Sequence, residues 1–289
     1  MLYLFLVPAL VYVAVFCYAP MYGVQIAFKN FKASKGIMGS AWVGLAHFKT
    51  FFSSPRFMLL LTNTLSVSVY SIIVGFPIPI ILALLFNYVQ YPWFKKFAQT
   101  VSYAPHFIST VVLVGMLSMF FSTTTGFVNT AIAALGFNKI HFFGEPQYFR
   151  HLYVWSGVWQ NMGWSAVIYI ATLSGVDPQQ HEAARIDGAT ILQRMWHIDL
   201  PALAPTIVIL LIMQAGSIMS VGYEKVYLMQ NSTNITTSEV ISTYTYKIGL
   251  ENAQFSYSAA IGLFNNVINF IMLVVVNTLT KKLSGMALW

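Results

Sequence analysis

The sequence predicts an all-α membrane protein with six transmembrane helices. Of its 289 residues, 8% are charged and 57% are hydrophobic, whereas about 25% of the residues in a soluble domain are charged. So few charges could not cover a soluble surface of this size. Several uncharged runs exceed the about 20 apolar residues that a helix needs to cross the hydrocarbon core. They lack the alternation of barrel strands, so we expect helical spans.

We expect these spans near 1–28, 57–87, 100–122, 151–173, 200–222 and 253–280. The first run has no basic start and is too long for the apolar region of a signal peptide. Since it begins abruptly, we expect a cytoplasmic segment to precede it in the native chain. Basic residues are slightly denser in the loops that would be cytoplasmic if both termini were inside, which favours that orientation.

The net charge of +7 does not indicate a nucleic-acid partner, because the 15 basic residues are scattered between apolar runs and form no basic stripe. In a membrane protein such an excess is typical of topology and of contact with membrane lipid. The single cysteine, Cys17, cannot form an internal disulfide bond, so we expect the fold not to depend on oxidation.

The polar segment 174–205, between the fourth and fifth expected spans, carries strong helix start and stop signals. Asp177 and Pro178 predict a capped helix start, with Gln180 as the third member of a capping box. Gly188 predicts the left-handed residue that ends this helix.

A second capping box, Thr190 with Gln193, predicts another short helix before Pro201 opens the next span. The segment is therefore predicted to form a helix-turn-helix outside the membrane. Capping alone would also be typical of an ordinary interfacial loop.

The same segment contains Glu182-Ala183-Ala184, then Gly188 after three residues, then Ile198-x-Leu200-Pro201 after nine more. This spacing resembles the EAA loop of ABC importer permeases at all seven defining positions. The resemblance implies the type I ABC importer permease fold and a cytoplasmic loop that docks into a cleft on an ATPase subunit. The coupling residues that it implies are Glu182, Ala183, Ala184, Arg185, Asp187, Gly188, Ile198, Leu200 and Pro201.

Further segments resemble the polysaccharide and oligosaccharide branch of sugar permeases: Pro20-Met21-Tyr22-Gly23, 26–31, Trp42-Val43-Gly44-Leu45, Tyr223-Glu224-Lys225-Val226, 240–244 and the tail ending in Leu288-Trp289. The resemblance covers essentially the whole chain, but the basic N-terminal segment usual in this family is absent. It implies domains at 1–56 (first helix and extracytoplasmic segment), 57–282 (permease core with the loop 174–199) and 283–289 (tail).

The resemblance also implies partners: a second homologous permease subunit, two ATP-binding subunits and an extracytoplasmic solute-binding protein. The substrate would be an oligosaccharide or polysaccharide, with an acidic one such as alginate and a neutral one both open. No G-x-x-x-x-G-K-[ST] phosphate loop occurs, so we expect ATP and Mg²⁺ to bind the ATPase subunits. We expect neither an enzyme nor a cofactor or metal site in this chain.

Polar and aromatic residues inside the expected spans are candidates for a sugar path, since amides bind hydroxyl groups and aromatic faces bind the apolar side of a pyranose. The candidates are Trp155, Trp159, Gln160, Asn161, Trp164, Gln214, Asn265 and Asn269. The alternative is hydrogen bonding between helices for the amides and an interfacial belt for the tryptophans. Gly75, Pro77 and Pro79 predict a kink that could also serve as a gate hinge.

Other classes of function fit the sequence less well. A secondary transporter or channel would need a buried coupling charge or a charged ring, and the span centres contain neither. An intramembrane enzyme would need a catalytic constellation, and no such motif is present.

The first extracytoplasmic segment, 29–56, carries five basic residues and no acidic one: Lys29, Lys32, Lys35, Lys49 and Arg56. This charge would attract an anionic saccharide or an acidic binding protein. The alternative is contact between these side chains and lipid head groups.

Overall fold

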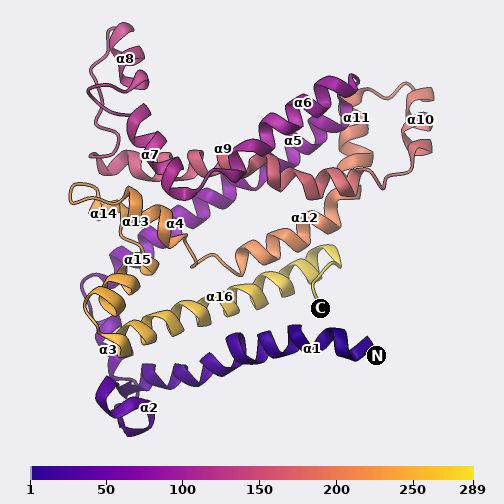
Figure 1. Cartoon of the computed structure of the whole chain (residues 1–289). Helices are drawn as coiled ribbons and strands as arrows, with labels where there is room; N and C mark the ends of the chain where they lie inside the picture. The colour runs from indigo at the N-terminus through magenta and orange to yellow at the C-terminus, as the bar shows by residue number, and fades with distance from the viewer. Residues whose placement is uncertain (1) are drawn as a thin grey trace. The chain divides into compact units, whose positions relative to one another are not determined.

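The computed structural model describes residues 2–289, with side chains from Phe5 onward. Met1, where the first expected span begins, lies outside the described residues. Most of the described chain is helical, as predicted (Figure 1). It forms two compact units: one comprises the chain up to Leu61 with Val240–Ile268, the other Thr62–Glu239 with Asn269–Trp289. The expected domain limits at residues 56 and 282 stay a prediction.

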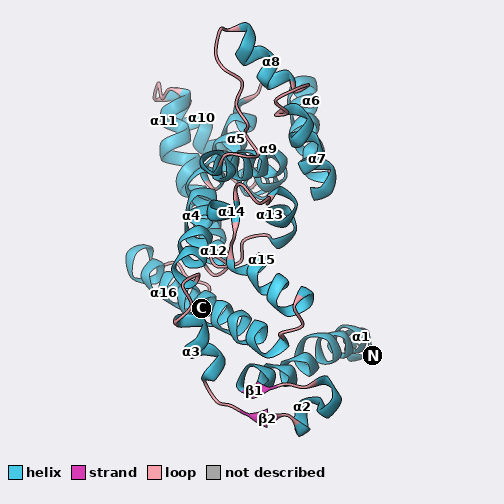
Figure 2. Ribbon diagram, turned by 90° about the vertical axis from the view of Figure 1, so that its left-hand side faces the viewer, coloured by secondary structure: helices cyan, strands magenta, loops and turns pink. Residues whose placement is uncertain are grey.

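The first unit contains a helical N-terminal segment, a small hairpin and an aromatic core. Its elements are α1 (Leu2–Val13), helical turns at Ala14–Tyr18 and Ala19–Phe28, β1 (Lys29–Asn30), a turn at Ala33–Lys35, α2 (Gly36–Gly39), β2 (Ala41–Trp42), α3 (Ala46–Phe52), the start of α4 (Phe57–Gly75), α15 (Ile241–Tyr246), a π-helical turn at Lys247–Glu251 and the first half of α16 (Phe255–Ser284). The strands, drawn in magenta in Figure 2, pair antiparallel with Lys29 opposite Trp42. Phe51 is buried and its ring contacts Phe57 and Phe264 edge-on.

The second unit contains most of the helices. They are the rest of α4, α5 (Pro77–Tyr88), α6 (Pro92–Tyr103), a 3-10 turn at Ala104–Phe107, α7 (Thr110–Phe120), α8 (Phe127–Ala134), α9 (Pro146–Leu173), α10 (Pro178–Ile186), α11 (Ile191–Arg194), a π-helical turn at Met195–Asp199, α12 (Leu200–Ala215), α13 (Tyr223–Met229), α14 (Ile235–Ser238) and the rest of α16. The helices α5, α9 and α12 share one apolar core, in which Ala83, Ala166 and Leu203 are fully buried. Between membrane helices such side chains stabilise the structure through close van der Waals packing.

The helices α6 and α9 touch at their backbones, which only glycine permits. A Cβ atom on Gly163 of α9 would lie 2.1 Å from the carbonyl oxygen of Ser102 in α6. Small residues allow this kind of close approach between membrane helices. Gly163 therefore fixes how closely these two helices pack.

Four helices of the described chain are long and apolar enough to cross a membrane: Phe5–Phe28, Phe57–Tyr88, Ile191–Ala215 and Phe255–Ser284. A fifth span results if the bent pair Pro92–Phe107 and Thr110–Phe120 counts as one. The remaining expected span, 151–173, lies within the 28-residue helix α9. Its Trp, Gln and Asn side chains make it less apolar than the others. By length and apolar character, the described chain therefore has four or five candidate spans, and the expected six are not confirmed.

The expected span 100–122 is broken at residues 108 and 109, where the chain bends by 100°. Ser109 caps the second helix, its hydroxyl accepting a hydrogen bond from the Val112 backbone N–H at 3.4 Å. The side chain of Gln160 donates to the Ile108 carbonyl at 2.8 Å, which satisfies an acceptor that the break leaves open. The break thus depends on a residue some fifty positions away, which local rules cannot reveal.

Candidate functional site

The first helix of the predicted helix-turn-helix, α10, has well-formed ends. The Asp177 side chain accepts a hydrogen bond from the Gln179 backbone N–H at 3.0 Å. This is a simple N-cap in place of the expected capping box with Gln180. At the other end Gly188 has φ +79°, and the N–H groups of Gly188 and Ala189 donate back to the carbonyls of Arg185 and Ala184. These two bonds make a Schellman motif, as the glycine predicted.

The second helix begins as predicted but is not separate from the following span. Thr190 and Gln193 form a complete capping box. The chain then continues through α11 and a π-helical turn at Met195–Asp199 directly into α12, so that Ile191–Ala215 is one helix. In this turn the Leu200 backbone N–H donates to the Met195 carbonyl five residues earlier, directly before Pro201, whose ring nitrogen carries no N–H. The expected short second helix is therefore the first turn of the membrane helix.

The expected coupling residues lie together on the surface of this loop. Glu182, Ala183, Arg185, Asp187, Gly188 and Pro201 are exposed, and Ala184, Ile198 and Leu200 are partly buried. The loop encloses a hollow of about 320 Å³ that includes Ala184, Gly188 and Ile198 in its lining. The geometry offers a rigid exposed helix with small side chains, which is suited to insertion into a groove of another protein.

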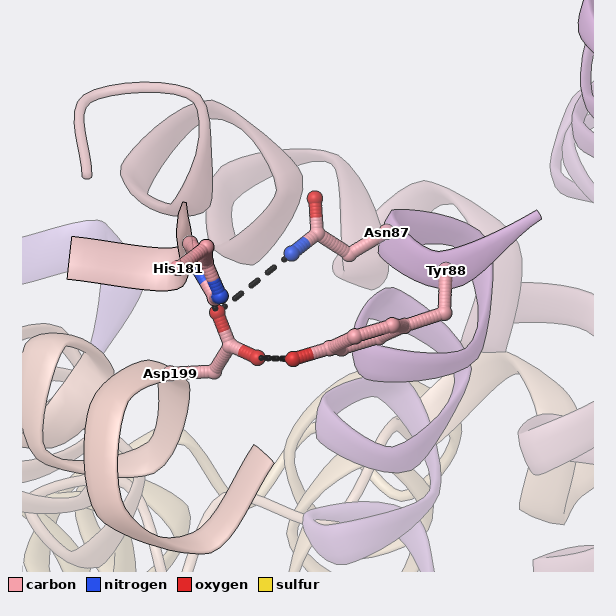
Figure 3. A network of polar contacts seen from close by, with 4 residues as sticks. All are labelled: Asn87, Tyr88, His181 and Asp199. Carbon is pink, nitrogen blue, oxygen red and sulfur yellow. Dashed lines mark hydrogen bonds and ion pairs between the residues drawn. The ribbon is translucent and has the colours of Figure 1, made fainter. Parts of the chain in front are cut away.

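Behind the loop lies a buried carboxyl group, Asp199, that sequence reasoning missed (Figure 3). Its Oδ2 accepts the Tyr88 hydroxyl at 2.6 Å, and its Oδ1 lies 3.4 Å from the Asn87 amide nitrogen. His181 of α10 places Nε2 3.3 Å from the same Oδ1. A carboxylate oxygen can only accept, so the Nε2–H tautomer of His181 satisfies this contact. The guanidinium of Arg194 lies over the Tyr88 ring, 5.4 Å from its centroid.

The aromatic candidates for the sugar path lie in different surroundings. Trp155 and Trp159 line an apolar cavity of about 440 Å³ between α7 and α9, and the Trp155 indole N–H donates to the Tyr70 hydroxyl at 3.0 Å. Trp164 stacks on His106 with 4.8 Å between ring centroids. These rings are half exposed, so they offer flat faces.

Several amide candidates form hydrogen bonds between neighbouring segments. Besides Gln160, the Asn161 side-chain oxygen lies 2.9 Å from His106 Nδ1. Asn269 accepts from the Met219 backbone N–H at 2.8 Å and donates to the Ser220 hydroxyl at 2.9 Å. Asn265 lies in the first unit, where its Oδ1 is buried without a hydrogen-bond partner among the described residues. Their role in a path stays a prediction.

Gln214 lies at two adjoining hollows in the second unit, both lined by a mixture of polar and apolar side chains, which we call the Gln214 cavity. The larger, of about 460 Å³, is lined by Gly75, Phe76, Pro79, Ser165, Ile168, Tyr169, Leu210, Met213, Gln214 and Ser217. The smaller, of about 150 Å³, is lined by Val67, Ser68, Ser71, Ile72, Tyr153, Gln214, Ser217, Ile218, Ser220, Val221 and Gly222. Sequence reasoning missed most of these hydroxyl groups because serines are common in membrane helices.

One basic side chain, Lys225 of α13, packs against α9. Its Nζ donates to the Tyr153 carbonyl at 2.9 Å and lies 4.8 Å from the centroid of the Tyr153 ring. Burial lowers the pKa of Lys225 to about 8, because desolvation disfavours the charged form.

Comparisons with known proteins agree with this geometry. A family model described as "binding-protein-dependent transport system inner membrane component" matches residues 75–285. The chain is 44% identical over 281 residues to the polygalacturonan/rhamnogalacturonan transport system permease protein YteP of Bacillus subtilis, covering 97% of this chain and 88% of the relative. Protein LplB of the same organism is 42% identical over equal shares.

A crystal structure of a bacterial ABC transporter involved in the import of the acidic polysaccharide alginate contains a similar chain. The two are 36% identical, with a TM-score of 0.91 over 98% of this chain and 96% of the other. A second structure, of the alginate transporter with an alginate pentasaccharide-bound periplasmic protein, matches with a TM-score of 0.92. The predicted resemblance to ABC sugar permeases is confirmed. The chain belongs to the family of binding-protein-dependent transport system inner membrane components, the permeases of ABC importers.

Proposed function

We propose that this chain is one of two permease subunits in an ATP-driven importer that carries acidic oligosaccharides or polysaccharides across the inner membrane. The observation that carries this proposal is the complete, exposed loop around α10, in a chain that belongs to this family. The partners are a second homologous permease, two ATP-binding subunits and an extracytoplasmic solute-binding protein. ATP and Mg²⁺ bind the ATPase subunits, and this chain performs no covalent chemistry.

In this proposal the loop converts ATPase movement into movement of the membrane helices. ATP closes the ATPase dimer and draws the two loops together, so the cavity opens outward to accept substrate; hydrolysis resets it. Glu182 contacts the ATPase, and Ala183 and Ala184 allow the close approach. Gly188 holds the turn with its positive φ, which a β-branched residue would distort.

Replacing Glu182 with Ala, or Gly188 with Val, tests this docking. We expect either variant to insert in the membrane but to lose at least tenfold of the substrate-stimulated ATP hydrolysis in the reconstituted complex. Gln180→Ala is the matched control, since it lies on the same helix but two positions away, on a different face. Native transport rates in both Glu182→Ala and Gly188→Val would show that the loop does not dock the ATPase.

We further propose six spans with both termini in the cytoplasm, with α9 as the fourth span and the bent pair α6–α7 as the third. The length of α9, 28 residues, supports this, because about 20 suffice to cross the core. Single cysteines introduced at Ser232 and Gln180, both exposed, should react with an impermeant thiol reagent from opposite sides of the membrane in a Cys17→Ala background. Labelling from the same side would contradict this orientation.

The Gln214 cavity is the part of the chain best suited to pass a saccharide, because hydroxyl and amide groups from α4, α9 and α12 converge on it. Cysteines replacing Gln214 or Ser217, in a Cys17→Ala background, should react with a water-soluble thiol reagent in at least one nucleotide state. Ile209→Cys, on a different face of α12, is the control and should stay unreactive. Protection of Gln214→Cys and Ser217→Cys from the reagent in every state would show that the substrate path does not pass through the Gln214 cavity.

The acidic substrate is supported by the names of the similar proteins, which refer to polygalacturonan, rhamnogalacturonan and alginate. The direct test is ATP hydrolysis by the reconstituted complex with its binding protein, screened over oligogalacturonates, alginate oligosaccharides and neutral maltooligosaccharides. We expect stimulation by one of the acidic series alone. Stimulation by the neutral series alone would leave the permease assignment intact but overturn the acidic substrate.

A further inference from the structure

Asp199 connects three segments of the second unit that are distant in sequence. Tyr88 and Asn87 end α5, His181 lies in the middle of α10, and Asp199 itself is the last residue before α12. The Asp199 side chain is fully buried, so its oxygens depend on these donors in place of water. The Figure 3 view shows the side chains converging on this one carboxyl group.

The two membrane helices joined at Asp199 also line the Gln214 cavity at their opposite ends. Pro79, near the start of α5, and Leu210 and Gln214, near the end of α12, contribute to its wall. Between the two ends, α5 and α12 pack with α9 in one apolar core. Close-packed cores of this kind transmit displacement as rigid bodies.

We propose that Asp199 is the positioning residue that transmits movement of α10 to α5 and α12, and so to the walls of the Gln214 cavity. This inference rests on the proposed function, in which α10 docks the ATPase. A displacement of α10 moves His181, and the shared carboxyl group carries that displacement to Tyr88 and to the first turn of α12. Asp199 itself is outside the surface that would touch the ATPase, because it is fully buried, and most of the His181 side chain is covered.

An acceptor-only group is required at this position. Asparagine has the same shape, but its amide nitrogen would face donor groups of Tyr88, Asn87 or His181. The cation of Arg194, over the Tyr88 ring, also favours a carboxylate over a neutral amide. Asp199→Asn therefore weakens the connection without changing the volume of the core.

The experiment measures basal and substrate-stimulated ATP hydrolysis, and uptake, in the full reconstituted complex. We expect Asp199→Asn and Tyr88→Phe to retain the ATPase subunits and basal hydrolysis, while stimulated hydrolysis and uptake each fall about tenfold. Tyr91→Phe, which removes an exposed hydroxyl three residues after Tyr88, is the matched control and should behave as the native chain. The double variant of Asp199 and Tyr88 should be no worse than the worse single variant, because both remove the same connection.

His181 supplies a readout that a merely structural role would not move. Glutamine can present its amide N–H in place of Nε2–H, so His181→Gln should recover most of the stimulated hydrolysis that His181→Leu loses. Native stimulation in Asp199→Asn and Tyr88→Phe would overturn the inference. Loss of the ATPase subunits from Tyr88→Phe and His181→Gln would also overturn it, since the cluster would then serve folding alone. Failure of the docking proposal is seen separately, as native transport in Glu182→Ala and Gly188→Val.

Discussion

Two charged groups of the second unit, the buried Asp199 and the half-buried Lys225, are accommodated in opposite ways. Asp199 receives side-chain groups from two other helices, α5 and α10. Lys225 contacts α9, through one carbonyl and one ring face of Tyr153. Desolvation lowers the pKa of Lys225.

The two environments predict different costs for removing the charged side chain of Asp199 or of Lys225. Tyr88, Asn87 and His181 all direct donor groups at the acid, so its removal would leave several polar groups unsatisfied. The lysine is held by a carbonyl that already belongs to a helix, so its removal would relieve desolvation as well as break a contact. We therefore expect the first site to be much more sensitive to substitution than the second.

The largest effect should come from Asp199→Ala. Removal of the carboxyl group leaves the half-buried Tyr88 and His181 without this acceptor, which should lower the free energy of unfolding by about 3 kcal/mol. Denaturant unfolding of the purified subunit in detergent measures this change. Asp187→Ala, at an exposed carboxyl group in the same loop, is the stability control and should change it by less than about 0.5 kcal/mol. Equal losses in the two variants would remove the distinction between the sites.

Lys225 should make the free energy of unfolding depend on pH. Its pKa of about 8 in the folded chain lies below the ordinary value of 10.5, so between these values the unfolded chain binds more protons than the folded one. The free energy of unfolding should therefore rise with pH across this window, by about 3 kcal/mol relative to Lys225→Met. The comparison is made by denaturant unfolding between pH 7 and 11. Parallel pH profiles for the two chains would contradict the lowered pKa.

A smaller loss is expected when one donor of Asp199 is removed and the carboxyl group is kept. Tyr88→Phe deletes the 2.6 Å hydrogen bond and should cost about 1.5 kcal/mol, as do hydrogen bonds to charged groups. Thermal unfolding in detergent, with Tyr91→Phe alongside, measures the difference. A loss as large as that of Asp199→Ala would mean that Tyr88 alone accounts for the cluster.

The smallest effect concerns basic side chains that are exposed, in contrast to Lys225. Lys32, Lys35 and Lys49 are exposed, whereas Lys29 is buried and donates to the Ile37 carbonyl at 2.9 Å. Replacing the three exposed lysines with Gln should lower uptake of an acidic saccharide about twofold to threefold at low salt, and hardly at all at high salt. Equal uptake and equal salt dependence would exclude electrostatic attraction by this segment. Lys29 is omitted because its loss would disturb the hairpin.

The loop around α10 could be predicted in detail because its signals are local. The caps at Asp177 and Thr190 and the turn at Gly188 depend on neighbours within a few positions, and such rules need no knowledge of the fold. The capping box expected at Gln180 was wrong in detail, since the Asp177 side chain binds the Gln179 N–H instead.

The cluster around Asp199 could not be predicted, because its partners come from far along the chain. Asp199 and Tyr88 are 111 positions apart, and local sequence patterns do not indicate that the end of α5 lies beside the start of α12. The one available signal was a charged residue directly beside an apolar span, where a buried charge is expensive and needs partners. The bend at Ile108 and the Gln214 cavity likewise depend on side chains from different helices.

The contact between Gly163 and Ser102 has a consequence for how the sequence can vary over evolutionary time. Every change at residue 163 adds at least a Cβ, which has no room beside the Ser102 carbonyl, and backbone cannot yield as a flexible side chain can. Gly115 has open space around it, so natural variants should drift freely there. Position 163 can change only if α6 and α9 separate, which would require compensating substitutions along the whole crossing. Among related permeases, we therefore expect glycine at this position in those chains whose α6 and α9 pack at the same distance as here.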